Sequence, residues 1–155
     1  MLGFVVLLLS MTHHLIVLKP QYLRLVLEGT KTLECRLSRT RRLPFGAVKV
    51  GDTLWLKRSA GPILAKARAK RVTSIELDGS TSLCDIESRY AVELGADPDF
   101  FRDRARVRYA TLIRFDHIRR IPAMRIEKRN RHAWVILPGP PQAAAEQTAA
   151  HSRGA

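Results

Sequence analysis

Cysteine is scarce in this sequence, which limits the chemistry that the chain can support. Among 155 residues there are only two cysteines, Cys35 and Cys84. Two are too few for a disulfide framework, and their spacing matches no zinc-ligand pattern. The adjacent His13 and His14 would point to opposite faces of a strand, which is poor geometry for one metal ion. We therefore expect no metal and no cofactor, and a reducing compartment, the cytoplasm, as the location.

Long apolar runs are also missing. The N-terminal run "MLGFVVLLLS" is shorter than the roughly 20 residues that cross a bilayer. No Lys or Arg precedes it and no small-residue cleavage pattern follows, so it is a poor signal peptide. We predict that residues 1–12 are a dispensable extension, with an edge strand or a weak membrane anchor as alternatives, and no integral membrane association. Residues 138–155 have little to bury and are predicted to be a disordered tail.

Acidic residues are few compared with basic ones. The chain has 14 Asp and Glu against 27 Lys and Arg, a formal net charge of +13. This excess says nothing about the fold, but it predicts attraction to polyanions such as RNA, DNA or an anionic membrane surface. Hydrophobic residues make up 46% of the chain, enough for one folded domain, which we place at residues 13–137.

The apolar pattern predicts more strands than helices. Alternating or short apolar runs predict strands at 14–19, 33–38, 53–59, 63–77, 107–121 and 131–137. Helices are predicted at 20–28, 81–95 and 97–106. Their start signals are Pro20, Thr81 or Ser82, and Asp97, and the stop signals are Gly29 and Gly95. The elements favour an α+β domain, a small curled sheet or β-barrel of five to six strands with two to three flanking helices.

The segment "GTKTLECR", residues 29–36, concentrates charge directly after a helix stop. On the strand that follows, Glu34 and Arg36 share one face, and Lys31 lies at the preceding turn. These three residues are either a partly exposed ion-pair cluster, which contributes little to stability, or a pocket for an anionic or nucleobase-like ligand. In the second reading Lys31 and Arg36 hold a phosphate or carbonyl, and Glu34 accepts from an exocyclic amine or orients Arg36.

This segment resembles the G-x-K-x-x-E-x-R signature of the ASCH domain, a branch of the PUA-like superfold. "LIVLKPQYLRLVLEG" before it and the Gly-Asp turn of "VKVGDTLWLK" after it also resemble that family. The resemblance implies a β-barrel with a cleft beside the first helix that binds RNA or nucleotides. Some members hydrolyse acetylated cytidine and some cleave single-stranded RNA. In the amidohydrolase members a threonine nucleophile stands where this chain has Glu34, which argues against that mechanism here.

The ligand-binding residues follow from the motif and its flanks. We predict that they are Lys19, Tyr22, Lys31, Glu34, Arg36, Trp55 and Lys57. Trp55 alternates away from the apolar residues of its strand, so we predict that it stacks on a base. Trp134, in "KRNRHAWVIL", is either a core residue or a second stacking residue. If the protein is an enzyme, Glu34 is the available general base and Lys31 stabilises developing negative charge.

Three basic groups are predicted to contact a nucleic-acid backbone, because no acid is interspersed among them. They are Arg39, Arg41 and Arg42 in a loop, Lys66, Arg68 and Lys70 on one strand face, and Lys128, Arg129 and Arg131 near the last strand. Each group is alternatively only a solvated surface. The sequence thus predicts an RNA- or nucleotide-binding protein. The alternatives are a small hydrolase of modified nucleosides or a ribonuclease using the same cleft, and a basic accessory protein of a ribonucleoprotein.

Overall fold

The structure is a computed structural model that describes residues 11–78, 82–102, 104, 106–128 and 130–143. Six strands and two helices are formed by these residues. In chain order they are β1 (His13–Leu18), α1 (Pro20–Leu27), β2 (Leu33–Ser38), β3 (Thr53–Arg58), β4 (Ile63–Glu76), α2 (Leu83–Leu94), β5 (Tyr109–Met124) and β6 (Trp134–Leu137). The predicted α+β class and the strand and helix numbers are confirmed.

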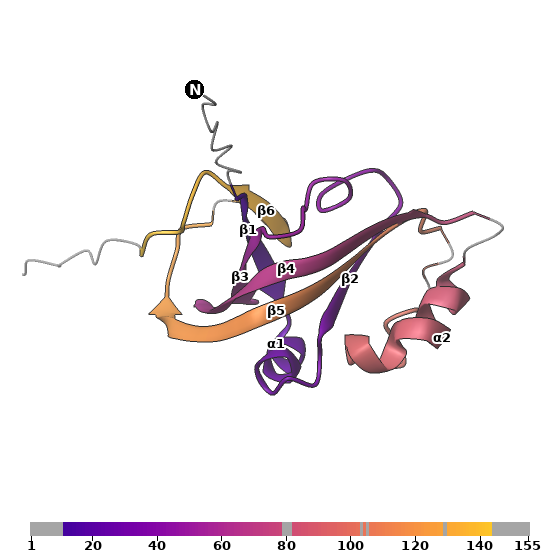
Figure 1. The fold of residues 1–155 in the computed structure, drawn as a ribbon, viewed down its shortest axis with the longest axis horizontal. Coiled ribbons are helices and arrows are strands. Elements are labelled where there is room, and N and C mark those ends of the chain that lie inside the picture. Colours follow the sequence, from indigo (N-terminus) through magenta and orange to yellow (C-terminus); the bar gives the residue numbers. More distant parts are fainter. Residues whose placement is uncertain (1–10, 79–81, 103, 105, 129, 144–155) are drawn as a thin grey trace, which may run out of the picture.

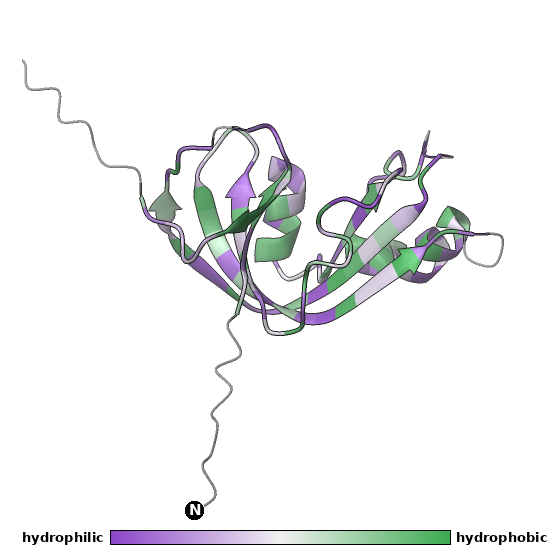
Figure 2. Ribbon diagram, turned by 90° about the horizontal axis from the view of Figure 1, so that it is seen from above, coloured by the Kyte–Doolittle hydropathy of each residue, from purple (hydrophilic) through white to green (hydrophobic). Residues whose placement is uncertain are grey.

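The strands form one curled sheet in the order β2-β5-β4-β3-β1-β6. β1 and β3 are parallel and every other neighbouring pair is antiparallel. The long strands β4 and β5 run side by side across the molecule, and the sheet curls into a half-barrel (Figures 1 and 2). β2 and β6 are therefore the two edges of the sheet, and we call the region between them the seam.

Strand β4 shows why the chain folds this way. Ala65, Ala67 and Ala69 are all buried and pack in the main core with Leu54 of β3 and Ile113 of β5. The residues between the alanines point to the other face, as the two-residue period predicts. Small side chains on the inner face let the sheet curl closely around α1, which lies inside the curve in Figure 2 and buries Leu23 and Val26 there.

The second helix encloses a separate core at the other end of the β4–β5 ribbon (Figure 1). Ile86 and Leu94 of α2 pack with Leu33 and Cys35 of β2 and Leu112 of β5. Ser82 caps this helix in a capping box with Asp85, and Gly95 ends it in the left-handed conformation. The Ser82 start and the Gly95 stop confirm the prediction from the sequence.

The predicted helix at 97–106 is wrong for the residues that are described there. The segment makes successive turns, with Phe100 N–H donating to the Asp97 carbonyl and Arg102 N–H to the Asp99 carbonyl. Phe100 and Phe101 both pack on the second core, with their rings edge to face. Adjacent residues of a helix point about 100° apart, so burying both in one core favours turns over a helix.

The two ends of the chain are only partly described. Residues 1–10 and 144–155 lie outside the described residues, so the predicted extension and tail remain predictions. Within the described ranges, no helix combines the length and apolar character needed to cross a membrane.

Candidate functional site

The three charged residues of the motif contact one another on the concave side of β2. Glu34 Oε2 lies 3.2 Å from Lys31 Nζ, and Glu34 Oε1 lies 2.7 Å from Arg36 Nε. Lys31 is only 4% exposed and Glu34 only 6%. The expectation of a partly exposed ion pair is therefore wrong. The reason is that helix α2 and the segment after it, distant in sequence, cover this end of β2.

Lys31 is held by backbone as well as by charge. Its ammonium donates to the carbonyl oxygens of Leu33 at 2.8 Å and Leu94 at 2.6 Å, and it lies 5.4 Å from the Tyr22 ring centre. Leu94 is the last residue of α2, where unpaired carbonyls and the helix dipole favour a cation. Lys31 thus joins α2 to β2 and also fixes one oxygen of Glu34. Its position indicates an anchoring role beneath the site.

Arg36 connects the two sides of the seam. Its Nη2 donates to the Val17 carbonyl of β1 at 2.9 Å, and its guanidinium carbon lies 5.5 Å from the Trp134 ring centre. Its Nε lies 2.7 Å from Glu34 Oε1 as an ion pair, but this buried nitrogen makes no hydrogen bond with the residues that the structure describes, because the distance is short while the direction is poor. The guanidinium is therefore held by an ion pair, one carbonyl and an aromatic ring, with donor groups left for a ligand.

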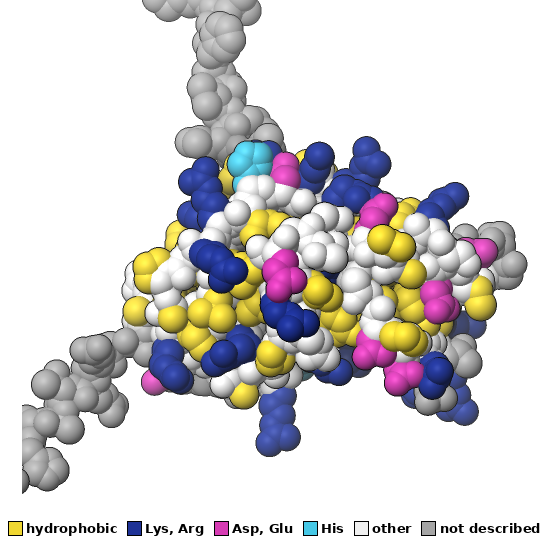
Figure 3. Space-filling model, turned by 90° about the horizontal axis from the view of Figure 1, so that it is seen from below, with side chains coloured by type: hydrophobic (Ala, Val, Ile, Leu, Met, Phe, Trp, Pro, Cys, Tyr) yellow, Lys and Arg dark blue, Asp and Glu magenta, His cyan; other side chains and the backbone are white. Residues whose placement is uncertain are grey.

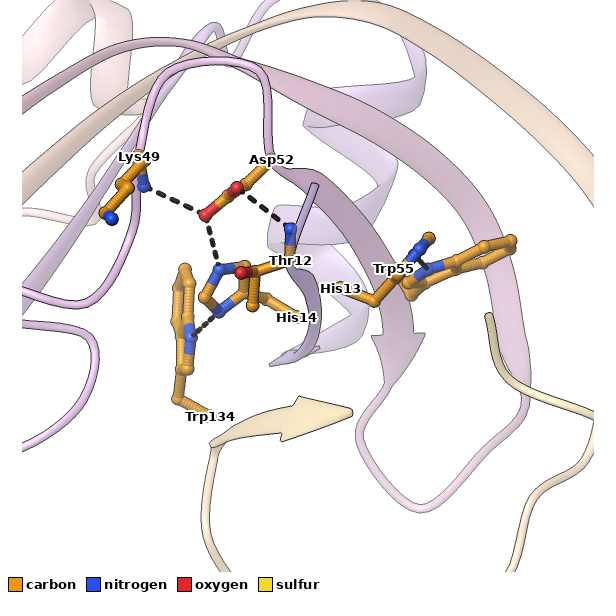
Figure 4. Close-up of polar contacts among 7 residues, drawn as sticks. All are labelled: Thr12, His13, His14, Lys49, Asp52, Trp55 and Trp134. Carbon is orange, nitrogen blue, oxygen red and sulfur yellow. Dashed lines mark hydrogen bonds and ion pairs between the residues drawn. The ribbon is translucent and has the colours of Figure 1, made fainter. Parts of the chain in front are cut away.

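A network of polar contacts fixes Trp134, the aromatic neighbour of Arg36 (Figure 4). The Trp134 indole Nε1–H donates to His14 Nδ1 at 3.1 Å, and His14 Nε2 lies 2.8 Å from Asp52 Oδ2. Asp52 in turn accepts the backbone N–H groups of Thr12 and Lys49. For His14 to accept from Trp134, its proton must be on Nε2, facing Asp52. Trp134 is thus a core residue, one of the two readings of the sequence, and it also supports the site.

A cleft of about 470 Å³ opens beside these charges, and we call it the motif cleft. Four of the residues predicted to bind the ligand lie together in its lining. They are Lys19, Tyr22, Glu34 and Arg36. A small cavity of about 40 Å³ lies below, lined among others by Tyr22, Lys31 and Glu34. Of these two spaces, Glu34 thus lines both, while Arg36 lines only the open cleft and Lys31 only the small cavity.

The cleft also has residues that the sequence reading missed. Asp97, Asp99, Phe100 and Arg104 line it from the segment after α2, and Arg104 lies 4.7 Å from the Phe100 ring centre. This segment had been predicted as a helix, without any role in binding. A Phe-Phe pair beside several arginines was the available signal, because aromatic residues among cations are typical of nucleic-acid sites.

Trp55 and Lys57 lie elsewhere, so the predicted role of Trp55 in base stacking fails on geometry. Trp55 is buried on the outer face of the sheet with Leu15 and Ile63, and its indole N–H donates to His13 at 3.1 Å. Partial burial, and second the nearby charge of Lys128, lower the pKa of the Lys57 ammonium there. His13 and His14 indeed point to opposite faces, as the sequence predicted.

The basic groups are less free of acids in space than in sequence. Arg68 makes two 3.0 Å hydrogen bonds to Asp116 of β5, and Arg41 pairs with Glu76 of β4. Arg68 lowers the pKa of the Asp116 carboxyl to about 2. Within the three predicted basic groups, the described cations for which no such ion pair is found are Arg39, Arg42, Lys66, Lys70, Lys128 and Arg131. Arg129 lies outside the described residues.

Positive charge nevertheless extends along the visible face of the molecule. In Figure 3, Lys and Arg side chains project mainly around the outline of this face, and Asp and Glu side chains are more frequent toward the end that holds α2. Such a surface attracts a polyanion without selecting a sequence. The concave motif cleft and this basic surface are therefore distinct candidates for recognition.

Metal and thiol chemistry receive no support from the described residues. They contain no group of three or more His, Cys, Asp or Glu side chains placed to hold a metal ion. Burial, followed by the nearby Glu34, raises the pKa of the Cys35 thiol to about 12. A protonated, enclosed thiol is a poor nucleophile, so Cys35 serves the core.

Comparisons with known proteins identify the fold. No family model matches the chain, and no curated protein matches its sequence. The crystal structure of an ASCH protein from Zymomonas mobilis matches with a TM-score of 0.63 and 17% identity, over 81% of this chain and 87% of that chain. Two single-residue variants of that protein match with TM-scores of 0.63 and 0.64 at 18% identity, over 81% of this chain and 89% and 87% of theirs. The chain has the fold of these ASCH proteins, as its motif predicted.

Proposed function

We propose that this protein, which has the fold of solved ASCH proteins, binds RNA or a nucleotide with a base in the motif cleft. The observation that carries the proposal is the pairing of Glu34 and Arg36 in the wall of a cleft of about 470 Å³. A cleft of this volume is within the range of small-ligand sites, roughly 300–1,000 Å³. It accommodates one base with its sugar.

The two charged groups present a carboxylate acceptor beside a guanidinium donor. A carboxylate accepts from the amino group of a base, and a guanidinium donates to a carbonyl oxygen or a ring nitrogen. Cytosine, guanine and adenine carry an amino group next to such acceptors, whereas uracil has no amino group. Tyr22 and Phe100 line the same cleft and offer apolar faces for the base. The chemistry favours a base with an amino group over uracil, and cytosine and guanine also offer a carbonyl oxygen.

Binding is favoured over catalysis by the contacts of Glu34. Each of its carboxylate oxygens already faces a cation, Lys31 or Arg36. A general base needs an oxygen directed at the proton it removes. The arrangement of Glu34 instead holds a fixed acceptor edge, which suits recognition.

The basic surface supplies affinity that is independent of sequence. With a net charge of +13, the protein releases counterions when it binds a polyanion, so affinity falls with salt. The cleft then adds selectivity for the base. Both features are expected in the same titration, one through its salt dependence and the other through its base preference.

The test is a calorimetric titration with short oligomers of C, G, A and U at low and moderate salt. We expect tighter binding of the C or G oligomer than of the U oligomer, and at least about tenfold weaker binding, about 1.4 kcal/mol, in Glu34→Gln. Glu28→Gln is the control, because Glu28 is an exposed acid on α1 that pairs with Arg24. Equal affinities for all four oligomers, together with an unaffected Glu34→Gln variant, would disprove the proposal.

A further inference from the structure

A second pocket lies on the other side of Arg36 from the motif cleft. It has a volume of about 630 Å³ and opens between β2, β6 and the loop that follows β2. We call it the seam pocket. Arg36, Leu37 and Ala133 line both this pocket and the motif cleft, so the two spaces adjoin. Arg36 therefore stands in a shared wall, with its guanidinium between them.

The two spaces differ in charge. The motif cleft has three carboxylates in its lining, Glu34, Asp97 and Asp99, together with its cations. The described lining of the seam pocket contains Arg36, Arg42 and His132 but neither Asp nor Glu. An anionic group therefore meets balanced charge on the cleft side, where Lys19, Arg36 and Arg104 offset the three carboxylates, and only cations on the seam side.

The rest of the seam pocket is suited to a flat, mainly apolar group. Leu37, Leu43, Trp134 and Ile136 are in its lining, and Leu43 and Ile136 remain 41% and 44% exposed. Mostly apolar walls with a few directed polar groups are typical of sites for small organic groups. Exposed apolar side chains beside two guanidinium groups match a nucleotide, which has a flat base and a phosphate.

The cations continue beyond this pocket. A third hollow of about 310 Å³ is lined by Arg39, Arg42 and Arg104, and it shares Leu37 with both other spaces. Among the described residues that line this hollow there is again no acid. Arginines thus line all three spaces around the outer edge of β2, as expected of a path for a phosphate backbone.

We infer that the seam pocket is a second nucleotide subsite, so that the ligand is an oligonucleotide with two adjacent nucleotides on either side of Arg36. The phosphate that joins them lies at the Arg36 guanidinium, and Arg42 contacts the 3′-phosphate of the second nucleotide. This inference rests on the proposed function, since it takes the first base to occupy the motif cleft.

The experiment compares cytidine 3′- and 5′-monophosphate with the dinucleotide CpC, made with a 3′-terminal phosphate, in calorimetric titrations of the full chain. We expect CpC to bind at least about tenfold tighter than either mononucleotide, because the second nucleotide adds contacts. Ile136→Glu places a carboxylate at the mouth of the seam pocket, and Arg42→Ala removes a cation from it. Both variants should lose most of the gain for CpC and keep the affinity for the mononucleotides.

Two controls match these variants. Val50→Glu makes the same change at an apolar residue that is 69% exposed, and Arg89→Ala removes an exposed arginine of α2. Both should retain the gain for CpC. Equal binding of CpC and the mononucleotides overturns the inference, as does a gain that survives in Ile136→Glu and Arg42→Ala. If no mononucleotide binds, or if Glu34→Gln binds it unchanged, the proposed function itself fails.

Discussion

The two faces of the sheet hold a tryptophan in the same way and use it differently. On the inner face Trp134 donates to His14 and lies 5.5 Å from the Arg36 guanidinium, while on the outer face Trp55 donates to His13 and its ring lies 5.7 Å from the Lys66 ammonium. Consecutive histidines of β1 thus orient two tryptophans, and the ring of each tryptophan makes a cation–π contact with one basic side chain.

The difference lies in what surrounds the cation. Arg36 has Glu34 at 2.7 Å and lines two adjoining spaces. Lys66 stands opposite Arg119 of β5 across the strand pair, and like charges at such positions repel. The inner face therefore combines enclosure with paired charge, which suits selection of a base, and the outer face offers open positive charge, which suits general attraction. The predictions below test this division.

The largest effect is expected for Lys31→Met. Removing the ammonium leaves the buried Glu34 with one cation fewer and leaves the carbonyls of Leu33 and Leu94 without their donor. Loss of one member of a buried ion pair costs about 3–5 kcal/mol of unfolding free energy. Denaturant unfolding measures it, and Lys49→Met is the control because the side chain of Lys49 is exposed. A loss of unfolding free energy below about 1 kcal/mol would show that the buried contacts of Lys31 do not stabilise the fold.

Glu34→Gln should follow, with an effect on stability as well as on binding. The sequence alone had suggested little change in stability, but Glu34 is buried between two cations, and an amide leaves both poorly paired. We expect a loss of about 1–3 kcal/mol in thermal unfolding. Asp116→Asn, which removes a more exposed carboxylate on the outer face, should be milder. A reversed order would contradict the division between the faces.

The double variant Lys66→Ala, Lys70→Ala should weaken RNA binding about equally for all sequences while the fold is retained. Each removed phosphate contact lowers the slope of log affinity against log salt by roughly one unit. Adding Arg68→Ala should change little more, because Arg68 is already paired with Asp116. Base-selective loss in the double variant would instead assign recognition to the outer face.

The smallest effect on RNA binding is expected when Arg68 loses its ion pair with Asp116. Asp116→Asn removes its partner, so the salt slope for RNA at pH 7 should steepen by roughly one unit. The fold lowers the pKa of Asp116 to about 2, so the stabilisation by its charge is complete above its ordinary value of 3.8 and is lost as the pH falls through about 2. Wild-type binding should therefore show no Asp116-dependent change between pH 5 and 8. An unchanged slope in the variant would show that Arg68 faces no phosphate.

Local pattern predicted the fold well, and the motif predicted part of the site. The alternation around Ala67 and the cap and stop of α2 depend on neighbouring residues, so they are readable in the sequence. The burial of Lys31 depends on Leu94, which is 63 residues away, and the orientation of the Arg36 guanidinium depends on Trp134. The alternation put Trp55 on the correct face, but only the chain after β5 shows that this face is covered. Such long-range contacts are not encoded in periodicity.

The most direct test uses the two tryptophans as reporters of the two faces. The chain has only two, so an ¹H–¹⁵N spectrum shows two indole N–H signals, assigned with Trp55→Phe. A short C-rich RNA at moderate salt should shift the Trp134 signal, since Trp134 lines the seam pocket, and saturate with the calorimetric affinity. The Trp55 signal should stay in place. A shift of Trp55 with Trp134 unmoved would contradict recognition at the motif cleft and seam.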